Sequence, residues 1–293
     1  MLRFRVPAST TNLGHGFDCL GIALTAANVI SVEPASNAAV VAPDAPDEGL
    51  ARMAGQVRDA CAKRWNTALP GFIVRVSGDV PVARGMGSSS TIFLGVAAAC
   101  QQLAGRPFAK QELLEIAATE EGHPDNAAAA CMGGFTIVAA TPQGLRWSRF
   151  AVPSDLVAVV AIPPFEVKTS EARRILPQQV ERAELVRGLQ RSALITAVLA
   201  SGRISDLTGL FDDAWHEQYR ATVNPGLIEA RAAAQKAGAI GTILSGSGST
   251  VLSFSLRARA SDVATAVLVS YRTRGVAAEM RTLDFDNAGL VAV

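Results

Sequence analysis

Residues 81–91 read Pro81-Val82-Ala83-Arg84-Gly85-Met86-Gly87-Ser88-Ser89-Ser90-Thr91. They follow an alternating apolar run at 72–76, which predicts a strand, and precede an Ala-rich run at 92–103, which predicts a helix. A helix N-terminus binds anions, because its first N–H groups lack intrahelical partners and its dipole favours negative charge. Glycines let the backbone approach a phosphate, and the hydroxyls can donate to phosphate oxygens or bind Mg²⁺. The stretch therefore predicts either a phosphate site or, more simply, a Ser-capped helix after a turn.

The stretch differs from the two commonest phosphate-binding motifs. It lacks the lysine of G-x-x-x-x-G-K-[ST], and Ser90 stands where G-x-G-x-x-G has its third glycine. It resembles instead Pro-x-x-x-Gly-Leu-Gly-Ser-Ser-(Ala/Ser), with Met86 in place of leucine. This is the signature of the GHMP kinases, which include galactokinase, homoserine kinase, mevalonate kinase and phosphomevalonate kinase. The resemblance implies that residues 81–91 bind ATP.

Composition limits the classes of protein and partner. The chain has 293 residues, of which 49% are apolar and 18% charged, as is typical of a compact globular protein. Its net charge is +1 with scattered basic residues, so we expect neither a nucleic-acid nor a membrane partner. The four cysteines are far apart, which argues against zinc and against a disulfide framework. With no apparent signal peptide or membrane span, we expect a cytoplasmic protein.

Residues 7–18 read Pro7-Ala8-Ser9-Thr10-Thr11-Asn12-Leu13-Gly14-His15-Gly16-Phe17-Asp18. The glycines around His15 predict a tight turn with Asn12 and Asp18 beside it; by composition alone this is a connecting loop. The segment resembles Pro-x-(Ser/Thr)-x-Asn-Leu-Gly-Pro-Gly-Phe-Asp, the N-terminal signature of the homoserine kinase branch of the GHMP kinases. It departs from that signature at Thr11 and His15.

Further strings resemble the same branch. Glu121-Gly122-His123-Pro124-Asp125-Asn126 precedes Gly133-Gly134, and residues 168–177 match Lys-Thr-x-x-Ala-Arg-x-Ile-Leu-Pro, with Arg173 as the arginine. His216 to Arg220, followed by 224–226, matches His-x-x-Tyr-Arg and Pro-Gly, and residues 245–250 match the third GHMP motif with Ser249 in place of proline. Each string is short, but their common order along the chain is hard to obtain by chance.

The resemblance implies a substrate site for an amino acid. L-Homoserine is a zwitterion, so its site needs an anion for the ammonium and cations or donors for the carboxylate. By resemblance, Asn12 and Asp18 bind the ammonium, while His123 and Arg220 bind the carboxylate.

The resemblance also implies the residues of phosphoryl transfer. Asn126 and Arg173 would hold the reacting hydroxyl, and Ser89 with Glu121 would bind Mg²⁺. Asn126 cannot act as a base, so catalysis would depend on alignment and charge neutralisation, with a phosphate oxygen taking the proton. Asp125 is left open as a general base.

The fold implied is α+β, with a ribosomal protein S5 domain 2-like domain at 1–152 and a ferredoxin-like domain at 153–293. Periodicity and breakers predict strands at 2–6 (ended by Pro7), 21–32, 135–139, 156–162, 251–254 and 277–283, and a variable loop at 34–48. They predict helices at 49–65, 110–121, 182–200, 204–219, 226–237 and 261–274.

The implied activity is ATP-dependent phosphorylation of the side-chain hydroxyl of L-homoserine, a step in threonine biosynthesis. The alternatives are a GHMP kinase for threonine or a mevalonate-like alcohol, and a non-catalytic ligand-sensing relative. An RNA-binding module, suggested by the ribosomal-type fold, lacks basic surface charge. The oligomeric state is left open, with a homodimer as the candidate.

Overall fold

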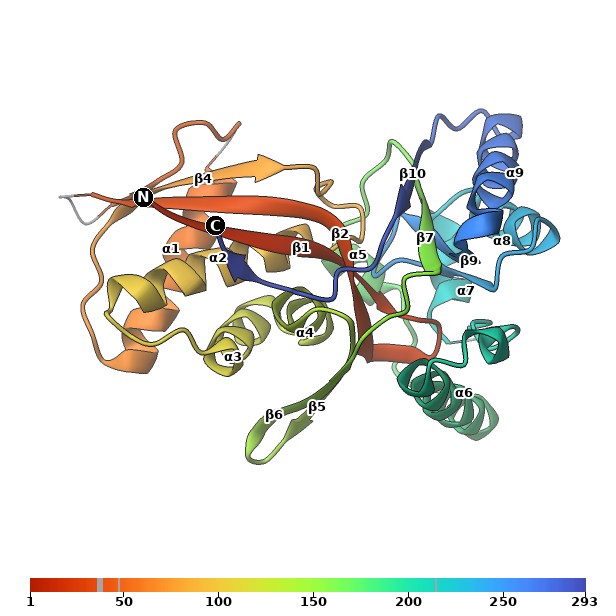
Figure 1. Cartoon of the computed structure of the whole chain (residues 1–293), viewed down its shortest axis with the longest axis horizontal. Coiled ribbons are helices and arrows are strands. Elements are labelled where there is room, and N and C mark those ends of the chain that lie inside the picture. Colours follow the sequence, from red (N-terminus) through yellow and green to blue (C-terminus); the bar gives the residue numbers. More distant parts are fainter. Residues whose placement is uncertain (36–38, 47, 214) are drawn as a thin grey trace.

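The computed structural model describes residues 1–35, 39–46, 48–213 and 215–293, and over these residues the strands form two sheets (Figure 1). The first sheet runs in the order β11-β1-β2-β4-β3, with β5 pairing both β2 and β6. Its strands are β1 (Leu2–Asn12), β2 (Gly16–Pro34), β3 (Val40–Val41), β4 (Phe72–Gly78), β5 (Phe135–Thr141), β6 (Gly144–Phe150) and β11 (Val291–Ala292).

The long hairpin of β1 and β2 brings Asn12 and Leu13, at its turn, into contact with the second half of the chain. The prediction that Pro7 ends the first strand was wrong: β1 continues to Asn12, with a shift in register between Pro7 and Ala8. A proline is tolerated in a sheet at such an irregularity, because no ladder hydrogen bond from its nitrogen is needed there. The turn around His15 is confirmed, and it joins the two strands.

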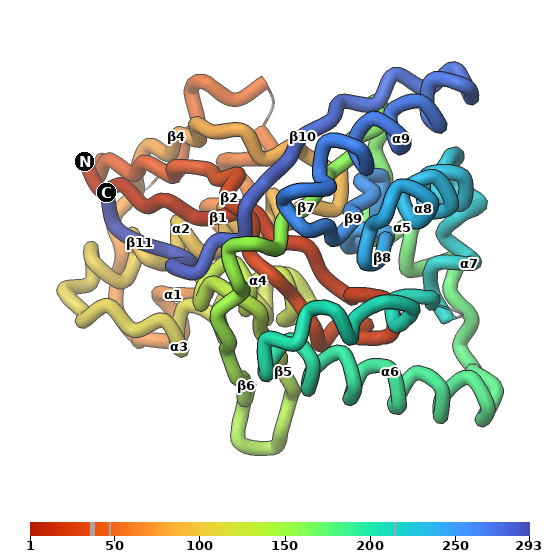
Figure 2. The backbone as a smooth tube through the Cα atoms, turned by 45° about the vertical axis from the view of Figure 1, so that its right-hand side comes forward, coloured from red at the N-terminus to blue at the C-terminus, as the bar shows by residue number. Residues whose placement is uncertain are grey.

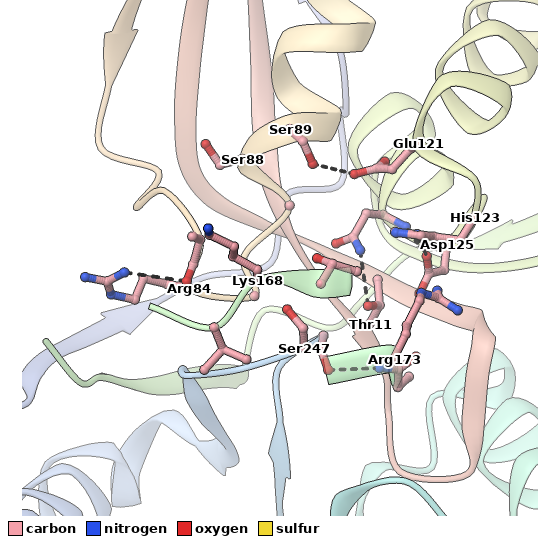
Figure 3. Close-up of a pocket in the computed structure, with 18 of the residues that line it drawn as sticks. Thr11, Arg84, Ser88, Ser89, Glu121, His123, Asp125, Lys168, Arg173 and Ser247 are labelled. Carbon is pink, nitrogen blue, oxygen red and sulfur yellow. Dashed lines mark hydrogen bonds and ion pairs between the residues drawn. The ribbon is translucent and has the colours of Figure 1, made fainter. Parts of the chain in front are cut away.

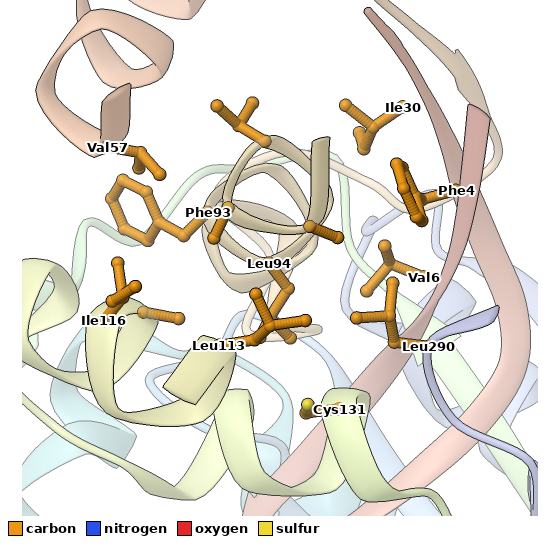
Figure 4. Close-up of a cluster of buried hydrophobic side chains, with 14 of the residues drawn as sticks. Phe4, Val6, Ile30, Val57, Phe93, Leu94, Leu113, Ile116, Cys131 and Leu290 are labelled. Atoms are coloured by element: carbon orange, nitrogen blue, oxygen red, sulfur yellow. The ribbon is translucent and has the colours of Figure 1, made fainter. Parts of the chain in front are cut away.

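Four helices pack on one face of the first sheet (Figure 1). They are α1 (Gly49–Trp65), α2 (Ser88–Leu103), α3 (Lys110–Glu121) and α4 (Asp125–Met132). Figure 4 shows the resulting core, in which α2 lies in the middle and Phe93 and Leu94 are surrounded by side chains of the sheet and of α1 and α3. This packing fixes the N-terminus of α2, which carries the glycine-serine stretch.

The second sheet runs in the order β10-β7-β9-β8. Its strands are β7 (Leu156–Ile162), β8 (Gly241–Leu244), β9 (Val251–Leu256) and β10 (Glu279–Leu283), and α8 (Leu227–Lys236) and α9 (Ala260–Thr273) pack on one face. Every residue of β7 is buried, because alternate side chains enter the cores on the two faces. This explains the unbroken apolar run at 156–162, and the strand order is that of a ferredoxin-like sheet.

The two sheets share an interior. One buried cluster combines Leu20 and Phe135 of the first sheet with Ile243 and Phe254 of the second. After β10 the chain returns to the first sheet, where β11 pairs with β1, and Figure 2 shows this return beside the N-terminal strand. The division at residue 152 stays a prediction.

Between β7 and β8 the chain forms α5 (Thr169–Arg174), α6 (Arg182–Ser201) and α7 (Glu217–Arg220). The helix predicted at 204–219 was wrong: the described residues there form a short 3₁₀ turn at Ile204–Leu207 and then α7, and residue 214 lies outside them. The loop predicted at 34–48 holds the short strand β3, and residues 36–38 and 47 likewise lie outside the described part. No described helix combines the length and hydrophobicity that crossing a bilayer requires.

Candidate active site

A cavity of about 310 Å³ lies where the end of β1, the N-terminus of α2 and α5 meet (Figure 3). It is lined by Thr11, Asn12, Phe17, Asp18, Met53, residues 82–85 and 87–89, Ile92, Glu121, His123, Asp125, Asn126, residues 167–169, Arg173, Arg220, Gly246 and Ser247.

The glycine stretch is held close to the third motif and to β1. Gly85 has φ +72°, and a Cβ there would lie 2.0 Å from the carbonyl oxygen of Ser245. Gly87 has φ +69° and is the residue before α2; a Cβ there would lie 2.3 Å from Ser9 Oγ. Both positions need a glycine for conformation and for space. The helix begins at Ser88, four residues earlier than predicted, so the serines form its first turn.

Glu121 ties the end of α3 to the first turn of α2. Ser89 Oγ donates to Glu121 Oε1 (2.5 Å), and Ser90 Oγ donates to Glu121 Oε2. Burial raises the pKa of the Glu121 carboxyl above its ordinary value, against the opposing effects of His123 and the two serine hydroxyls. In Figure 3, Glu121 and Ser89 face each other across the upper wall of the cavity.

His123, Asp125 and Asn126 form a hydrogen-bonded group at the start of α4. His123 Nδ1 donates to Asp125 Oδ1 (2.9 Å), and the backbone N–H of Asn126 donates to the same oxygen (2.9 Å). Burial alone would lower the pKa of His123, but the Asp125 carboxylate more than offsets this, so the pKa is raised. Burial alone would raise the pKa of Asp125, but the His123 hydrogen bond and charge dominate, so the pKa is lowered. The Asn126 amide is oriented by Ser9, which donates to its Oδ1 (2.8 Å).

Asp18 and Arg173 pair across the cavity wall. Arg173 Nη1 and Nη2 donate to the two oxygens of Asp18 (2.9 and 2.5 Å). Asn12 lies beside them: its Oδ1 accepts the backbone N–H of Asp18 (3.2 Å), and its Nδ2 donates to the carbonyl of Gly246 (3.1 Å). Two residues predicted to act on different parts of a substrate thus contact each other directly.

Arg220 is buried, with 2% of its surface exposed, yet lines the cavity. Its described hydrogen-bond partners are neutral: the carbonyls of Ala172 and Gly246 and the imidazole of His216. Burial, the largest cause, and the nearby Arg173 lower the pKa of Arg220 to about 10. The guanidinium therefore remains charged at neutral pH without a carboxylate partner among the described residues.

The structure brings most of the predicted site residues to one cavity. Of the stretch 81–91, Pro81, Met86, Ser90 and Thr91 do not line it. Ser90 instead bonds Glu121, and Thr91 Oγ1 accepts from Asn28. These contacts fix the first turn of α2, whose other residues line the cavity.

Several lining residues were missed by sequence reasoning. Lys168 and Thr169 stand in a segment from which only Arg173 was taken, so the signal was present in the sequence. Ser247 belongs to the third motif, whose residues were recognised without a role. Phe17 stands in the N-terminal signature but was given no role. Met53 gave no signal, because an apolar side chain in a cavity resembles a core residue in sequence.

Two groups could hold a metal ion. Asp18, His123 and Asp125 bring ligand atoms within 4.8 Å of one another, but Asp18 and Asp125 are already paired with Arg173 and His123. Ser89 and Glu121 offer oxygen atoms beside a helix N-terminus, and oxygen is the ligand that Mg²⁺ prefers. The donor set of Ser89 and Glu121 fits a nucleotide-bound Mg²⁺ better.

Comparisons with known proteins agree with this architecture. Residues 47–134 match the model of the GHMP kinases N terminal domain, and residues 195–271 match that of the GHMP kinases C terminal. The crystal structure of homoserine kinase from Cytophaga hutchinsonii superposes with a TM-score of 0.89, covering 100% of this chain and 97% of that one at 23% identity. At 23% identity the superposition shows that the two chains share a fold.

Relatives found by sequence share a larger fraction of identical residues with this chain than that crystal structure does. A homoserine kinase of Microchaete diplosiphon is 36% identical over 292 residues, which span 97% of this chain and 94% of the relative. A homoserine kinase of Deinococcus radiodurans is 38% identical over 256 residues, 85% of this chain and 83% of the relative. The chain therefore belongs to the GHMP kinases and, within them, to the homoserine kinase family.

Proposed function

We propose that this chain transfers the γ-phosphoryl group of ATP to the side-chain hydroxyl of L-homoserine, forming O-phospho-L-homoserine on the route to threonine. Relatives over 30% identical that carry the name homoserine kinase support it. The observation that carries the substrate assignment is Arg220, a buried cation without an acidic partner among the described residues. A buried charge is costly unless an opposite charge compensates it, and a substrate carboxylate would do so.

The amino-acid substrate would be held at both charged ends. Arg220, with His123, would bind the carboxylate, and Asp18, with the Asn12 side chain, would bind the ammonium. Asp18 is paired with Arg173, so the ammonium would take the place of part of the guanidinium at Asp18. Arg173 would then have N–H groups with which to hold the reacting hydroxyl, the role that the family resemblance implies for it.

The nucleotide phosphates would lie along the glycine stretch. Gly85 and Gly87 let the backbone approach closely, and the first turn of α2 offers unpaired N–H groups. Lys168, an exposed side chain on the cavity wall, adds a cation. Ser89 and Glu121 would hold Mg²⁺, which when bound supplies neutralisation of the phosphate charge.

The chemistry would rest on alignment. The amide oxygen of Asn126 accepts from Ser9, and its Nδ2 donates to Thr11 Oγ1 (3.4 Å). The second N–H of this Nδ2 would donate to the reacting hydroxyl. Asp125 accepts from His123 and has a lowered pKa, which makes it a weak base. We assign Asp125 to the orientation of His123 and leave the proton to a phosphate oxygen.

A coupled assay of ADP release tests the proposal. The purified protein with ATP and Mg²⁺ is offered L-homoserine, L-threonine, L-serine and mevalonate. We expect the highest kcat/KM with L-homoserine, since its hydroxyl lies one carbon beyond that of serine while both ends of the zwitterion are bound. A higher kcat/KM with mevalonate would show that no ammonium is required and would overturn the substrate assignment. Homodimer formation and a cytoplasmic location remain predictions.

A further inference from the structure

The guanidinium of Arg220 is fixed by three neutral acceptors from three parts of the chain. Nε donates to the carbonyl of Ala172 in α5 (3.3 Å), and Nη1 donates to the carbonyl of Gly246 in the third motif (2.8 Å). Nη1 also lies 3.5 Å from Nδ1 of His216, one turn earlier along the chain. No described protein acceptor bonds Nη2, so this edge is left for a ligand.

His216 is the only side chain among these three acceptors. The imidazole is fully buried, and its Nε2 lies 3.0 Å from the carbonyl oxygen of Gly14. A carbonyl can only accept, so Nε2 carries the hydrogen, and Nδ1 of a neutral ring is then the acceptor that faces Arg220. The chain of bonds runs from Arg220 through His216 to the β1–β2 turn.

The surroundings of His216 fix its backbone and keep its ring neutral. Asp213 accepts the backbone N–H groups of His216 and Glu217 (2.7 and 2.6 Å), which fixes the backbone before α7. The charged and titratable groups near the ring are Asp213, His15 and Arg220. Burial, with smaller contributions from Arg220 and His15, lowers the pKa of His216 to about 4, so the ring is neutral at neutral pH.

We propose that His216 is a positioning residue, whose neutral imidazole accepts from Arg220 and aims the free edge of its guanidinium at the substrate carboxylate. The inference rests on the proposed function, in which Arg220 binds that carboxylate. A carboxylate in place of His216 would fix Arg220 equally well but would compensate its charge. A neutral acceptor orients the cation and leaves its charge to the substrate.

A matched pair of variants separates the two ends of the ring. In His216→Asn, the amide oxygen takes the place of Nδ1 and can still accept from Arg220, whereas the bond to Gly14 is lost. In His216→Gln, the amide nitrogen takes the place of Nε2 and can still donate to Gly14, whereas the acceptor for Arg220 is lost. We expect His216→Gln to raise the KM for homoserine about tenfold or more, and His216→Asn to raise it about twofold. The KM for ATP should change little in either variant.

Equal effects of the two variants, or parallel rises in both KM values, would overturn the proposal and leave His216 a structural role. The tautomer can be measured without any variant, because the chain has only three histidines. Long-range ¹H–¹⁵N spectra of the labelled wild type at neutral pH should show His216 with its hydrogen on Nε2. A hydrogen on Nδ1 would overturn the proposal even if a variant failed to fold.

A comparison of homoserine with 3-aminopropanol, which lacks the carboxylate, distinguishes a failure of the proposed function from a failure of the role proposed for His216. If wild type uses homoserine and 3-aminopropanol, which lacks the carboxylate, equally well, Arg220 does not bind a carboxylate and the proposed function is at fault. If wild type prefers homoserine and His216→Gln keeps the full preference, only the role of His216 is refuted.

Discussion

In the proposed function Arg220 and Asp18 bind the two charged ends of the amino acid, and they differ in the groups that hold their side chains. Asp18 has a charged partner in Arg173, whereas Arg220 is surrounded by neutral acceptors. A ligand ammonium must therefore compete with Arg173 for Asp18, while a ligand carboxylate meets no competitor at Arg220. We expect the carboxylate to contribute more of the binding free energy than the ammonium.

Substitution of Arg220 by lysine tests the contribution of the substrate carboxylate. A lysine keeps the charge but has no planar pair of donors for a carboxylate. It also cannot bond the neutral acceptors of Arg220 in the same geometry. We expect Arg220→Lys to raise the KM for homoserine about tenfold or more, equivalent to about 1.4 kcal/mol or above, with the KM for ATP almost unchanged. Arg174, the neighbour of Arg173 on α5, supplies the control as Arg174→Lys. Equal rises in both KM values would assign Arg220 to the fold or to the phosphates.

Glu121 is expected to act through its charge. Glu121→Gln keeps the size and an oxygen that a serine can donate to, but removes the charge that would hold Mg²⁺. We expect kcat to fall by at least about a hundredfold, since neutralisation of phosphate charge is central to phosphoryl transfer, while the thermal midpoint stays near that of wild type. The control is Glu120→Gln, since Glu120 bonds the exposed Gln56. Full activity of Glu121→Gln would place the metal elsewhere.

His216 gives folding a pH dependence that can be isolated. Burial is the main reason that its pKa falls from 6.5 to about 4 in the folded protein. Between these values the unfolded chain binds a proton that the folded protein does not, so the free energy of unfolding decreases as the pH falls from 6.5 towards 4. A shift of this size corresponds to about 3 kcal/mol. Urea unfolding at about pH 7 and about pH 4 should show wild type losing this much stability relative to His216→Gln. If the difference in stability between wild type and His216→Gln is the same at both pH values, the prediction is contradicted.

At the scale of elements, the glycine turn before α2 must be both left-handed and close to its neighbours. Gly85→Ala adds a Cβ that would lie 2.0 Å from a backbone oxygen of Ser245, so the turn must move. We expect the KM for ATP to rise about tenfold or more, since misplaced phosphate-binding groups reduce binding by at least about 1.4 kcal/mol. Gly105→Ala is a matched control, because Gly105 has φ +65° but no atom within 4 Å of the added Cβ. Equal effects in the two variants would mean that the left-handed conformation alone matters.

Elements bounded by glycine or proline could be predicted from sequence, whereas a helical pattern without such a boundary was misleading. The helices at 49–65 and 110–121 and the strand at 156–162 agree with the structure at both ends. Residues 204–219 look helical but form short turns, because Asp213 accepts backbone N–H groups and starts a new helix at Glu217. Local hydrogen bonds of this kind compete with a helical period.

Contacts between distant residues lay beyond the sequence. The family strings predicted which residues gather, and the structure adds how they pair: Asp18 with Arg173, 155 positions apart, and Ser9 with Asn126, 117 apart. The hydrogen bond from Ser90 to Glu121 also depends on the packing of α3 against α2. Such pairings follow from tertiary packing, for which the sequence carries no local signal.

At the scale of the whole molecule, the interior shared by Leu20, Phe135, Ile243 and Phe254 makes the two sheets one thermodynamic unit. Neither half can unfold without exposing the apolar surface of the other, which costs about 25 cal/mol per Å². Heating should therefore give one calorimetric transition, with equal calorimetric and van't Hoff enthalpies. Phe254→Ala, a change in the second sheet, should reduce hydrogen-exchange protection of β1 amides as much as of β7 amides. Two resolved transitions would contradict this; a single one means that heat resistance belongs to the chain as a whole rather than to either sheet.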